Sequence, residues 1–281
     1  MKIKYQTLFL VLLGVLLPLW GQEGKTRKKT APKPAKDELV KNGGMEKGEG
    51  NQPAHWSPLD GITSTWDSQN GHPGKCIHFD TSVLQKDKKK FAENPENFKR
   101  GKGGQYDVVG AHEGAWAFAA PIDIPKGQRY FVLSCDVKGP SKGTELFNPM
   151  ILVRGFQKVT EKNAGENSSW FHEHFKDGVG YSEQFGSDEL RRVTREGDYL
   201  MVYRHSLVCR CLAPNTWEHF ELGIQLPTIP KFQPERILLK LYAYWPAGNY
   251  YFDNVSFRPS TKEEVQEVNS KRHSIKNFVN P

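Results

Sequence analysis

Apolar and polar residues alternate along residues 236–259, and this alternation predicts two strands joined by a turn. In the first strand, one set of alternate positions is apolar throughout and comprises Ile237, Leu239, Leu241 and Ala243. A period of two is typical of a strand with one face on a core and the other face open. Pro246 and Gly248 are residues that turns favour. The second strand, 250–257, carries Asp253 among aromatic and branched residues, where a carboxylate needs a cation, a metal or backbone donors as partner.

Similar patterns recur along most of the chain. Further short strands are predicted at 75–79, 128–138, 150–156, 198–211 and 217–226. The core-facing sets are Phe131, Leu133, Cys135 and Val137 in the second of these, and Phe220, Leu222, Ile224 and Leu226 in the last. A short helix is expected at 86–92, and the tail is expected either to form a weak helix on the surface or to stay loose. Many short strands with almost no helix favour a single all-β sandwich.

The first residues of the chain predict an export signal. Lys2 and Lys4 precede the apolar run 8–20, which is too short to span a bilayer comfortably. An uncleaved membrane anchor is the alternative. We therefore divide the chain into a signal peptide (1–21), a basic disordered linker (22–37), a β-sandwich domain (38–260) and a C-terminal tail (261–281). The folded part is expected to be secreted, periplasmic or in the cell envelope.

The net charge of the chain excludes few classes of function. The chain has 281 residues and a formal net charge of +7, and six of its cationic residues lie in 25–36. That segment is either a solvated spacer or a contact with an anionic envelope or polysaccharide. Because these basic residues lie in a linker, without a helix or repeat to place them in a groove, nucleic-acid recognition is not expected.

Four cysteines, Cys76, Cys135, Cys209 and Cys211, permit disulfides outside the cytoplasm without requiring them. Cys135 belongs to the core-facing set of its strand. Cys209 and Cys211 share one face of a strand at about 6–7 Å between their Cα atoms, which makes a bond between these two awkward. We expect buried thiols, either all four or with one bridge.

Short motifs lie near both ends of the predicted domain. They are ELVKNGGMEKG (38–48), GKCIHFD (74–80) and YYFDNVSF (250–257), and the loop after the first of them holds Trp56, Gly61 and Trp66. These motifs resemble the opening, the next strand and the last strand of exported bacterial carbohydrate-binding modules with the galactose-binding-like jelly-roll fold. The resemblance spans roughly residues 38–259. It implies a β-sandwich jelly roll that binds a polysaccharide or cell-envelope glycan without catalysis, and we expect a monomer.

The same resemblance implies a structural calcium site between the opening and closing strands. On this sequence the ligands would be the carboxylates of Glu46 and Asp253 and the backbone of Gly44 and Lys75. Carboxylate and carbonyl oxygens are the ligands that Ca²⁺ prefers. The family often has another acidic residue where this chain has Asn70-Gly71-His72, which reduces the ligand charge. The alternative is a hydrogen-bonded Glu46 and an Asp253 that caps backbone amides.

Outward-facing residues on several strands are charged or aromatic, a combination that binds sugars by stacking and by charge-assisted hydrogen bonds. If these strands share one sheet, that sheet presents a charged and aromatic face. In the modules that the chain resembles, the glycan lies either across that sheet or in loops at the edge of the sandwich, and the resemblance implies one of these two places here. The candidate ligand residues are Arg154, Trp170, Glu221, Lys240, Tyr242, Tyr244 and Trp245, with Asp136 also facing outward and Trp116 as a further stacking platform. The alternative is that the polar residues are solvated and the tryptophans cover edges of the core.

Two other classes of function stay open. The chain has no nucleophile-elbow, zincin or phosphate-loop motif, but a jelly-roll polysaccharide lyase or hydrolase could use Arg154, His219 and Tyr242. An irregular insertion near 160–197 would contribute to such a site. It also holds His172 and His174, a candidate metal pair without an evident third ligand. The third class is an envelope protein-interaction module, which an apolar outer patch would favour.

Overall fold

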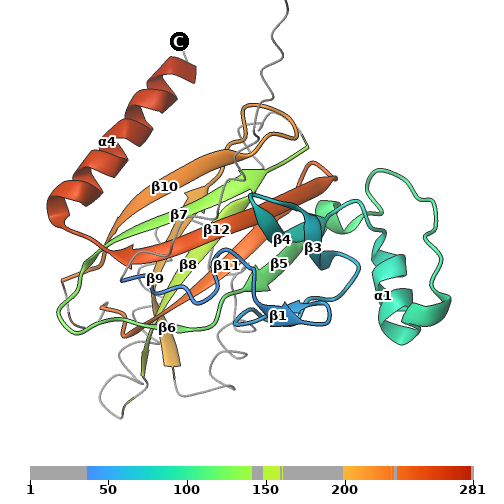
Figure 1. Ribbon diagram of the computed structural model, residues 1–281, viewed down its shortest axis with the longest axis horizontal. Helices are drawn as coiled ribbons and strands as arrows, with labels where there is room; N and C mark the ends of the chain where they lie inside the picture. The colour runs from blue at the N-terminus through green and yellow to red at the C-terminus, as the bar shows by residue number, and fades with distance from the viewer. Residues whose placement is uncertain are drawn as a thin grey trace, which may run out of the picture. The chain divides into compact units, whose positions relative to one another are not determined.

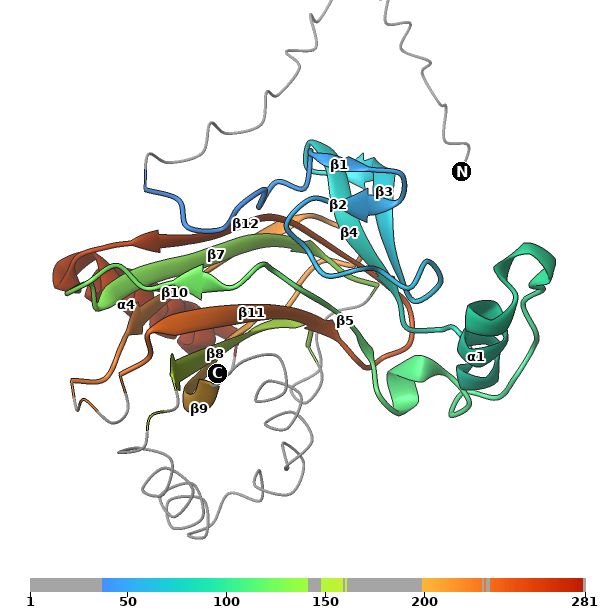
Figure 2. The ribbon, with the colours of Figure 1, turned by 90° about the horizontal axis from the view of Figure 1, so that it is seen from below.

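The computed structural model describes residues 37–140, 148–158, 160, 199–228, 230 and 233–279, with side chains described as far as Lys271. The core of the described part is built from two sheets that pack face to face (Figure 1, Figure 2). The predicted signal peptide (1–21), the linker as far as residue 36 and the insertion near 160–197 lie outside the described residues.

The two sheets are built from antiparallel ladders. The first sheet has the order β10-β7-β12-β4-β3, with bounds Glu218–Gln225 (β10), Tyr130–Lys138 (β7), Asn249–Pro259 (β12), Gly74–Asp80 (β4) and Ser64–Gly71 (β3). The second has the order β5-β11-β8-β9, with bounds Ala115–Phe118 (β5), Arg236–Ala243 (β11), Met150–Lys158 (β8) and Tyr199–Val208 (β9). Two-residue strands complete the set: Ile122–Asp123 (β6) pairs with β11, and Gly48–Glu49 (β1) pairs with Gln52–Pro53 (β2).

Alternate residues of facing strands fill the space between the sheets. Phe131, Leu133, Ile237 and Leu239 have no exposed surface, as their positions in the alternating pattern predict. Phe220, at the edge of the first sheet, is partly buried against the same cluster. The predicted all-β sandwich is therefore confirmed.

Two elements near the N-terminus differ from the prediction. The segment around Trp66, expected as a loop, forms the edge strand β3, whose sequence STWDSQNG has no apolar alternation to reveal it. The expected opening strand is irregular instead. Leu39 donates to the carbonyl oxygen of Phe257 and Val255 donates to that of Gly43, so the segment lies along β12 without a regular ladder.

Residues 85–104 leave the sandwich as an excursion that we call the lysine arm (Figure 1). It contains the predicted helix, α1 (Gln85–Glu93), followed by the 3₁₀ turn η1 (Pro95–Asn97). Asp87 lies in the first turn of α1, where the helix dipole favours a carboxylate. Its buried Oδ2 accepts a hydrogen bond of 2.7 Å from the backbone N–H of Gly101, which ties the two ends of the arm together. A second 3₁₀ turn, η2 (Val109–Ala111), leads from the arm to β5.

The tail forms a helix, α4 (Lys262–Val279), that packs on the outer face of the first sheet beside its edge strand β10 (Figure 1). A Cβ added to Gly223 would lie 2.5 Å from the carbonyl oxygen of Val265, so the helix needs glycine at this contact. Asn269 accepts from the N–H of Gly223 and donates to its carbonyl oxygen, both at 3.0 Å. These bonds occupy backbone groups at the edge of the sheet. Of the helices described, none is long and apolar enough to cross a membrane.

Replacing Asn269 by alanine is expected to lower the free energy of unfolding by about 1–3 kcal/mol, because both backbone groups of Gly223 lose this partner. Urea unfolding of the purified protein measures the difference. Gln266→Ala, on the exposed side of the same helix, is the control and should change the free energy by less than about 0.5 kcal/mol. Equal stabilities of the two variants would show that α4 does not depend on this contact.

Candidate functional site

The predicted ligand residues lie on two different sheets. Arg154 (β8), Lys240 and Tyr242 (β11) belong to the second sheet, and Tyr244 and Trp245 directly follow β11. Asp136 (β7) and Glu221 (β10) belong to the first sheet. The condition that all these strands share one sheet is therefore not met, because alternation fixes the face of a strand but not its neighbours. Trp170, like His172 and His174, lies outside the described residues.

On the outer face of the second sheet, ladder pairing brings aromatic and cationic residues together. Tyr242 of β11 pairs with Trp116 of β5 on one side and with Met150 of β8 on the other. The ammonium of Lys240 lies 4.7 Å from the centroid of the Trp116 ring and 5.3 Å from that of Tyr242, within the range of cation–π attraction. Lys240 and Arg154 are themselves buried, at 9% and 4% exposure.

Five aromatic residues gather where β11 ends, and we call them the aromatic edge: Tyr106, Trp116, Tyr242, Tyr244 and Trp245. The rings of Tyr242 and Tyr244 are stacked at 6.2 Å and 19°, and those of Tyr106 and Trp245 at 6.2 Å and 9°. Tyr106 is 72% exposed, and the other four are partly exposed. The aromatic edge therefore presents ring surfaces to solvent.

The segment that follows the lysine arm holds the aromatic edge in place. The hydroxyl of Tyr242 donates to the carbonyl oxygen of Glu113 at 3.2 Å, and that of Tyr244 donates to the carbonyl oxygen of Ala111 at 3.3 Å. Gly114 has a φ of +72°, and a Cβ there would lie 2.8 Å from the Tyr242 ring. Glycine is thus required both by the backbone conformation and by the close approach of the ring.

Cationic residues lie on the second sheet and on the lysine arm, and two of them, Lys240 and Lys88, contact the aromatic edge. The four strands β5, β11, β8 and β9 contain no Asp or Glu, and their cationic residues are Arg154, Lys158, Arg204, Arg236 and Lys240. The lysine arm adds five exposed lysines: Lys86, Lys89, Lys90, Lys99 and Lys102. Lys88 joins the arm to the edge, because its ammonium lies 2.7 Å from Glu113 Oε1 and 5.0 Å from the Trp116 ring centroid.

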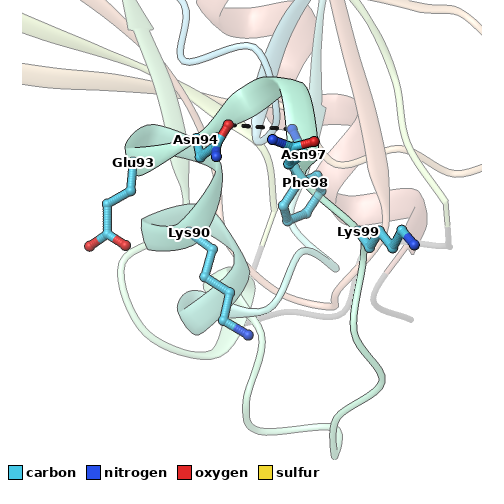
Figure 3. A pocket seen from close by; sticks show the side chains of 6 residues that line it. All are labelled: Lys90, Glu93, Asn94, Asn97, Phe98 and Lys99. Carbon is cyan, nitrogen blue, oxygen red and sulfur yellow. Dashed lines mark hydrogen bonds between the residues drawn. The ribbon is translucent and has the colours of Figure 1, made fainter.

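The lysine arm also forms an open hollow of about 350 Å³ (Figure 3). Its lining is mostly polar or charged and consists of Lys90, Glu93, Asn94, Asn97, Phe98 and Lys99. The side-chain oxygen of Asn94 accepts a hydrogen bond of 3.4 Å from the backbone N–H of Asn97, drawn as a dashed line in Figure 3. None of its lining residues belongs to the aromatic edge.

The outer face of the first sheet carries a different arrangement, centred on Asp136. Its carboxylate lies 3.0 Å from His72 Nδ1 and 2.7 Å from His219 Nδ1, and it accepts from Asn254 Nδ2 at 2.8 Å. Burial alone would raise the pKa of Asp136, but the hydrogen bonds from His219, Asn254 and His72 outweigh it and lower that pKa. The bond to Asp136 in turn raises the pKa of His219, whose Nε2 lies 3.5 Å from Glu221. Glu221 therefore belongs to this network and not to the aromatic edge.

This arrangement overturns the catalytic set considered from sequence. Arg154 and Tyr242 face outward from the second sheet, whereas His219 faces outward from the first. Because the core lies between the two faces, these three side chains cannot act on one bond.

The candidate calcium ligands do come together at the outer face of the first sheet. Glu46 Oε1 accepts from the backbone N–H of Lys75 at 2.9 Å. Asp253 has no exposed surface, and its carboxylate accepts from the N–H groups of His72 (2.6 Å) and Asn254 (2.7 Å). Burial raises the pKa of Asp253 to about 7, and the like charges of Glu46 and Asp136 add to this rise. Gly44 lies beside Asn254, since an added Cβ would be 3.6 Å from its Oδ1.

The carboxylate oxygens of Glu46 and Asp253 are donors of the type that a hard cation prefers, but they are few. Two mutually repelling carboxylates, one of them buried, are the setting in which a divalent cation lowers the electrostatic cost. Within the described ranges, no three His, Cys, Asp or Glu side chains are grouped so as to hold a metal ion. Backbone carbonyls, such as those of Gly44 and Lys75, would have to supply the remaining ligands. The hydrogen bonds that Glu46 and Asp253 make to backbone N–H groups equally match the metal-free alternative.

Sequence reasoning missed Tyr106 and Lys88. Tyr106 stacks on Trp245, far along the chain, and lies in a Gly-rich loop without periodicity. Lys88 is one of several lysines in a charged run, and nothing in that run distinguishes the one that reaches Trp116. Both contacts arise only when the arm returns beside β11.

No protein-family model matches the chain, and no curated protein matches it either. Among solved structures it is similar to the enzymatically active domain of bacteriophage CBA120 tailspike protein 4, with 11% identity, a TM-score of 0.41, and coverage of 79% of this chain and 21% of that chain. It is similar to the module TmCBM61 in complex with beta-1,4-galactotriose, with 10% identity, a TM-score of 0.39, and coverage of 79% and 99%. It is also similar to a family 16 carbohydrate-binding module, with 11% identity, a TM-score of 0.38, and coverage of 78% and 98%.

Modules of families 4 and 22 also have similar structures. At this identity and these TM-scores, the likenesses carry no argument about ligand or mechanism. Carbohydrate-binding modules, which the sequence motifs resemble, are thus also the majority among these similar solved structures.

Proposed function

We propose that this protein is a non-catalytic carbohydrate-binding protein that acts outside the cytoplasm and recognises an acidic polysaccharide at the aromatic edge. The observation that carries the proposal is the pair of stacked ring systems, Tyr242–Tyr244 and Tyr106–Trp245, set at the end of a cationic sheet. Sugar rings present apolar C–H faces that pack on such aromatic surfaces. The aromatic edge supplies that contact over neighbouring positions.

The acidic character of the ligand follows from the charges beside the edge. The four strands of the second sheet carry cations without carboxylates, and the lysine arm adds exposed lysines. A neutral glycan would gain nothing from this field, whereas carboxylate or sulfate groups on a polysaccharide would be attracted to it. Since Arg154 and Lys240 are buried in this conformation, we assign the direct ionic contacts first to the lysine arm.

The two competing classes have less support. An enzyme would need acid and base groups in one cleft, and Arg154, Tyr242 and His219 face opposite sides of the sandwich. A protein-interaction module would be favoured by a contiguous apolar patch. Among the residues that the structure describes, only Tyr106 and Leu212 are large hydrophobic residues with high exposure.

Binding to insoluble and arrayed glycans tests the proposal. The protein is expected to bind polygalacturonate or a sulfated polysaccharide, and Trp245→Ala is expected to weaken binding about fivefold, because one stacked ring contributes about 1 kcal/mol. Trp217→Ala is the matched control, since Trp217 is also partly exposed but stacks on His72 at the first sheet.

Three outcomes of this experiment would contradict the proposal. Release of a shortened or unsaturated product would show that the protein is an enzyme. Equal losses in the two tryptophan variants would remove the aromatic edge as the site. No binding to any glycan by the folded protein would reject carbohydrate recognition.

The lysine arm gives a second prediction. Changing Lys86, Lys89 and Lys90 together to Gln is expected to weaken binding to the acidic glycan at least about threefold at low salt, because each exposed ionic contact contributes about 0.2–1 kcal/mol. The difference should shrink as salt screens the charges. Affinity measured over a salt series checks both expectations. Lys41, Lys47 and Lys262, exposed elsewhere, provide the matched triple variant, which should bind like the unmodified protein.

We also propose that Ca²⁺ binds between Glu46 and Asp253 as a structural ion. Calcium at about a hundred times its dissociation constant is then expected to raise Tm by roughly 5–10 °C, and a chelator to reverse the shift. Glu46→Gln should abolish the shift, whereas Glu49→Gln, at an exposed position of the neighbouring hairpin, should keep it. Identical melting in calcium and in chelator would favour the hydrogen-bonded alternative.

A further inference from the structure

Two cysteines from opposite sheets meet in the core. Cys135 lies on β7 of the first sheet, and Cys209 directly follows β9 of the second. Their Sγ atoms are 3.7 Å apart, and neither residue has exposed surface. The two positions are separated by 74 residues along the chain.

The other two cysteines lie in different surroundings. The thiol of Cys211 is 3.9 Å from the carbonyl oxygen of Cys209, and a Cβ added to Gly139 would lie 3.5 Å from its Sγ. Cys76 lies on β4, where the negative charges of Asp67 and Asp253 help to raise the pKa of its thiol after the larger effect of burial. The sulfur–sulfur contact of 3.7 Å is between Cys135 and Cys209, so this is the pair that the geometry favours.

We propose that Cys135 and Cys209 form a disulfide that joins the two sheets when the protein folds in the presence of a disulfide oxidant. A disulfide needs Sγ atoms about 2.05 Å apart, so the bond requires these two sulfurs, already in contact at 3.7 Å, to move closer together. Hydrogen-bonded ladders run within each sheet, so this bond would add a covalent link across a core that is otherwise held by packing.

The oxidant is a small-molecule or protein disulfide, such as glutathione disulfide. The thiolate of one cysteine attacks a sulfur of the oxidant, which forms a mixed disulfide and releases one oxidant thiolate. The thiolate of the second cysteine then attacks the protein sulfur of that mixed disulfide and releases the other. The two cysteines lose two protons and two electrons, and the oxidant is reduced to two thiols. Because both sulfurs are fully buried in the finished sandwich, the exchange must occur before the sheets close.

The bond would act mainly on the unfolded chain. It closes a loop that contains β8 and β9, so the unfolded state loses conformational freedom that the folded state does not have. A loop of this length corresponds to a rise in Tm of roughly 10 °C in a domain of this size. The stabilisation therefore applies to the whole domain.

The test is to refold the purified protein in a glutathione redox buffer and to alkylate it in denaturant. The refolded protein should be lighter by two hydrogen atoms and should label at two cysteines instead of four. Peptide mapping should join Cys135 to Cys209. Protein refolded with a reductant in place of the redox buffer should have a Tm lower by roughly 10 °C. Cys76→Ala and Cys211→Ala should keep the mass loss, whereas Cys135→Ala and Cys209→Ala should abolish it.

Four labelled cysteines in the refolded protein, or a bond mapped to another pair, would overturn the proposal. If an alanine variant at either core position does not fold, mapping of the unmodified protein still decides the question. Glycan binding does not enter the readout, so the outcome is independent of the proposed function.

Discussion

Burial of one alternate set of residues in a shared core determines where every outward side chain of the sandwich lies. In β11, Ile237, Leu239 and Leu241 have no exposed surface, so Lys240 and Tyr242 must face outward. Ladders on both sides of β11 then fix the neighbours of Tyr242, which are Trp116 and Met150. A slip of one residue would place all these side chains in the core. The positions of Tyr242 and Trp116 in the aromatic edge are therefore set by the ladders of β11 and β5.

The rest of the aromatic edge depends on segments that are not strands. Trp245 stands at the turn after β11, and Tyr106 stands where the lysine arm returns to the sandwich. The hydroxyls of Tyr242 and Tyr244 bond carbonyl oxygens of the segment that leads from the arm to β5. These bonds attach that segment to β11 and to the residues that directly follow it. Tyr106 lies just after the lysine arm, so the segment that carries the lysines also brings an aromatic ring to Trp245.

Sequence patterns predicted local features well and long-range neighbours poorly. Alternation identified the core-facing sets of β7 and β11, because burial on one face leaves a period of two in the sequence. It could not show that β10 and β11 belong to different sheets, since strand order depends on pairing between distant segments. Edge strand β3 was not predicted because its sequence is mostly polar and has no alternating apolar side chains. The motifs at the two ends predicted that the opening segment would lie near the closing strand, and that segment does lie along β12.

Acidic residues are unevenly distributed between the two sheets, and this distribution bears on how the proposed anionic glycan would approach the sandwich. The first sheet carries six acidic residues: Asp67, Asp80, Asp136, Glu218, Glu221 and Asp253. In the second sheet the strands β5, β11, β8 and β9 carry none, and the two-residue strand β6 carries Asp123, whose carboxylate lies 2.8 Å from Arg236 of β11. Packed sheets are about 10 Å apart, close to the distance of about 8 Å over which physiological salt screens charge. An anionic chain near one face therefore feels mainly that face. Under the proposed function, an anionic glycan would be repelled from the network around Asp136 and attracted to the cations of β8, β9 and β11 beside Tyr242, so electrostatics would favour that face before any ring contact forms.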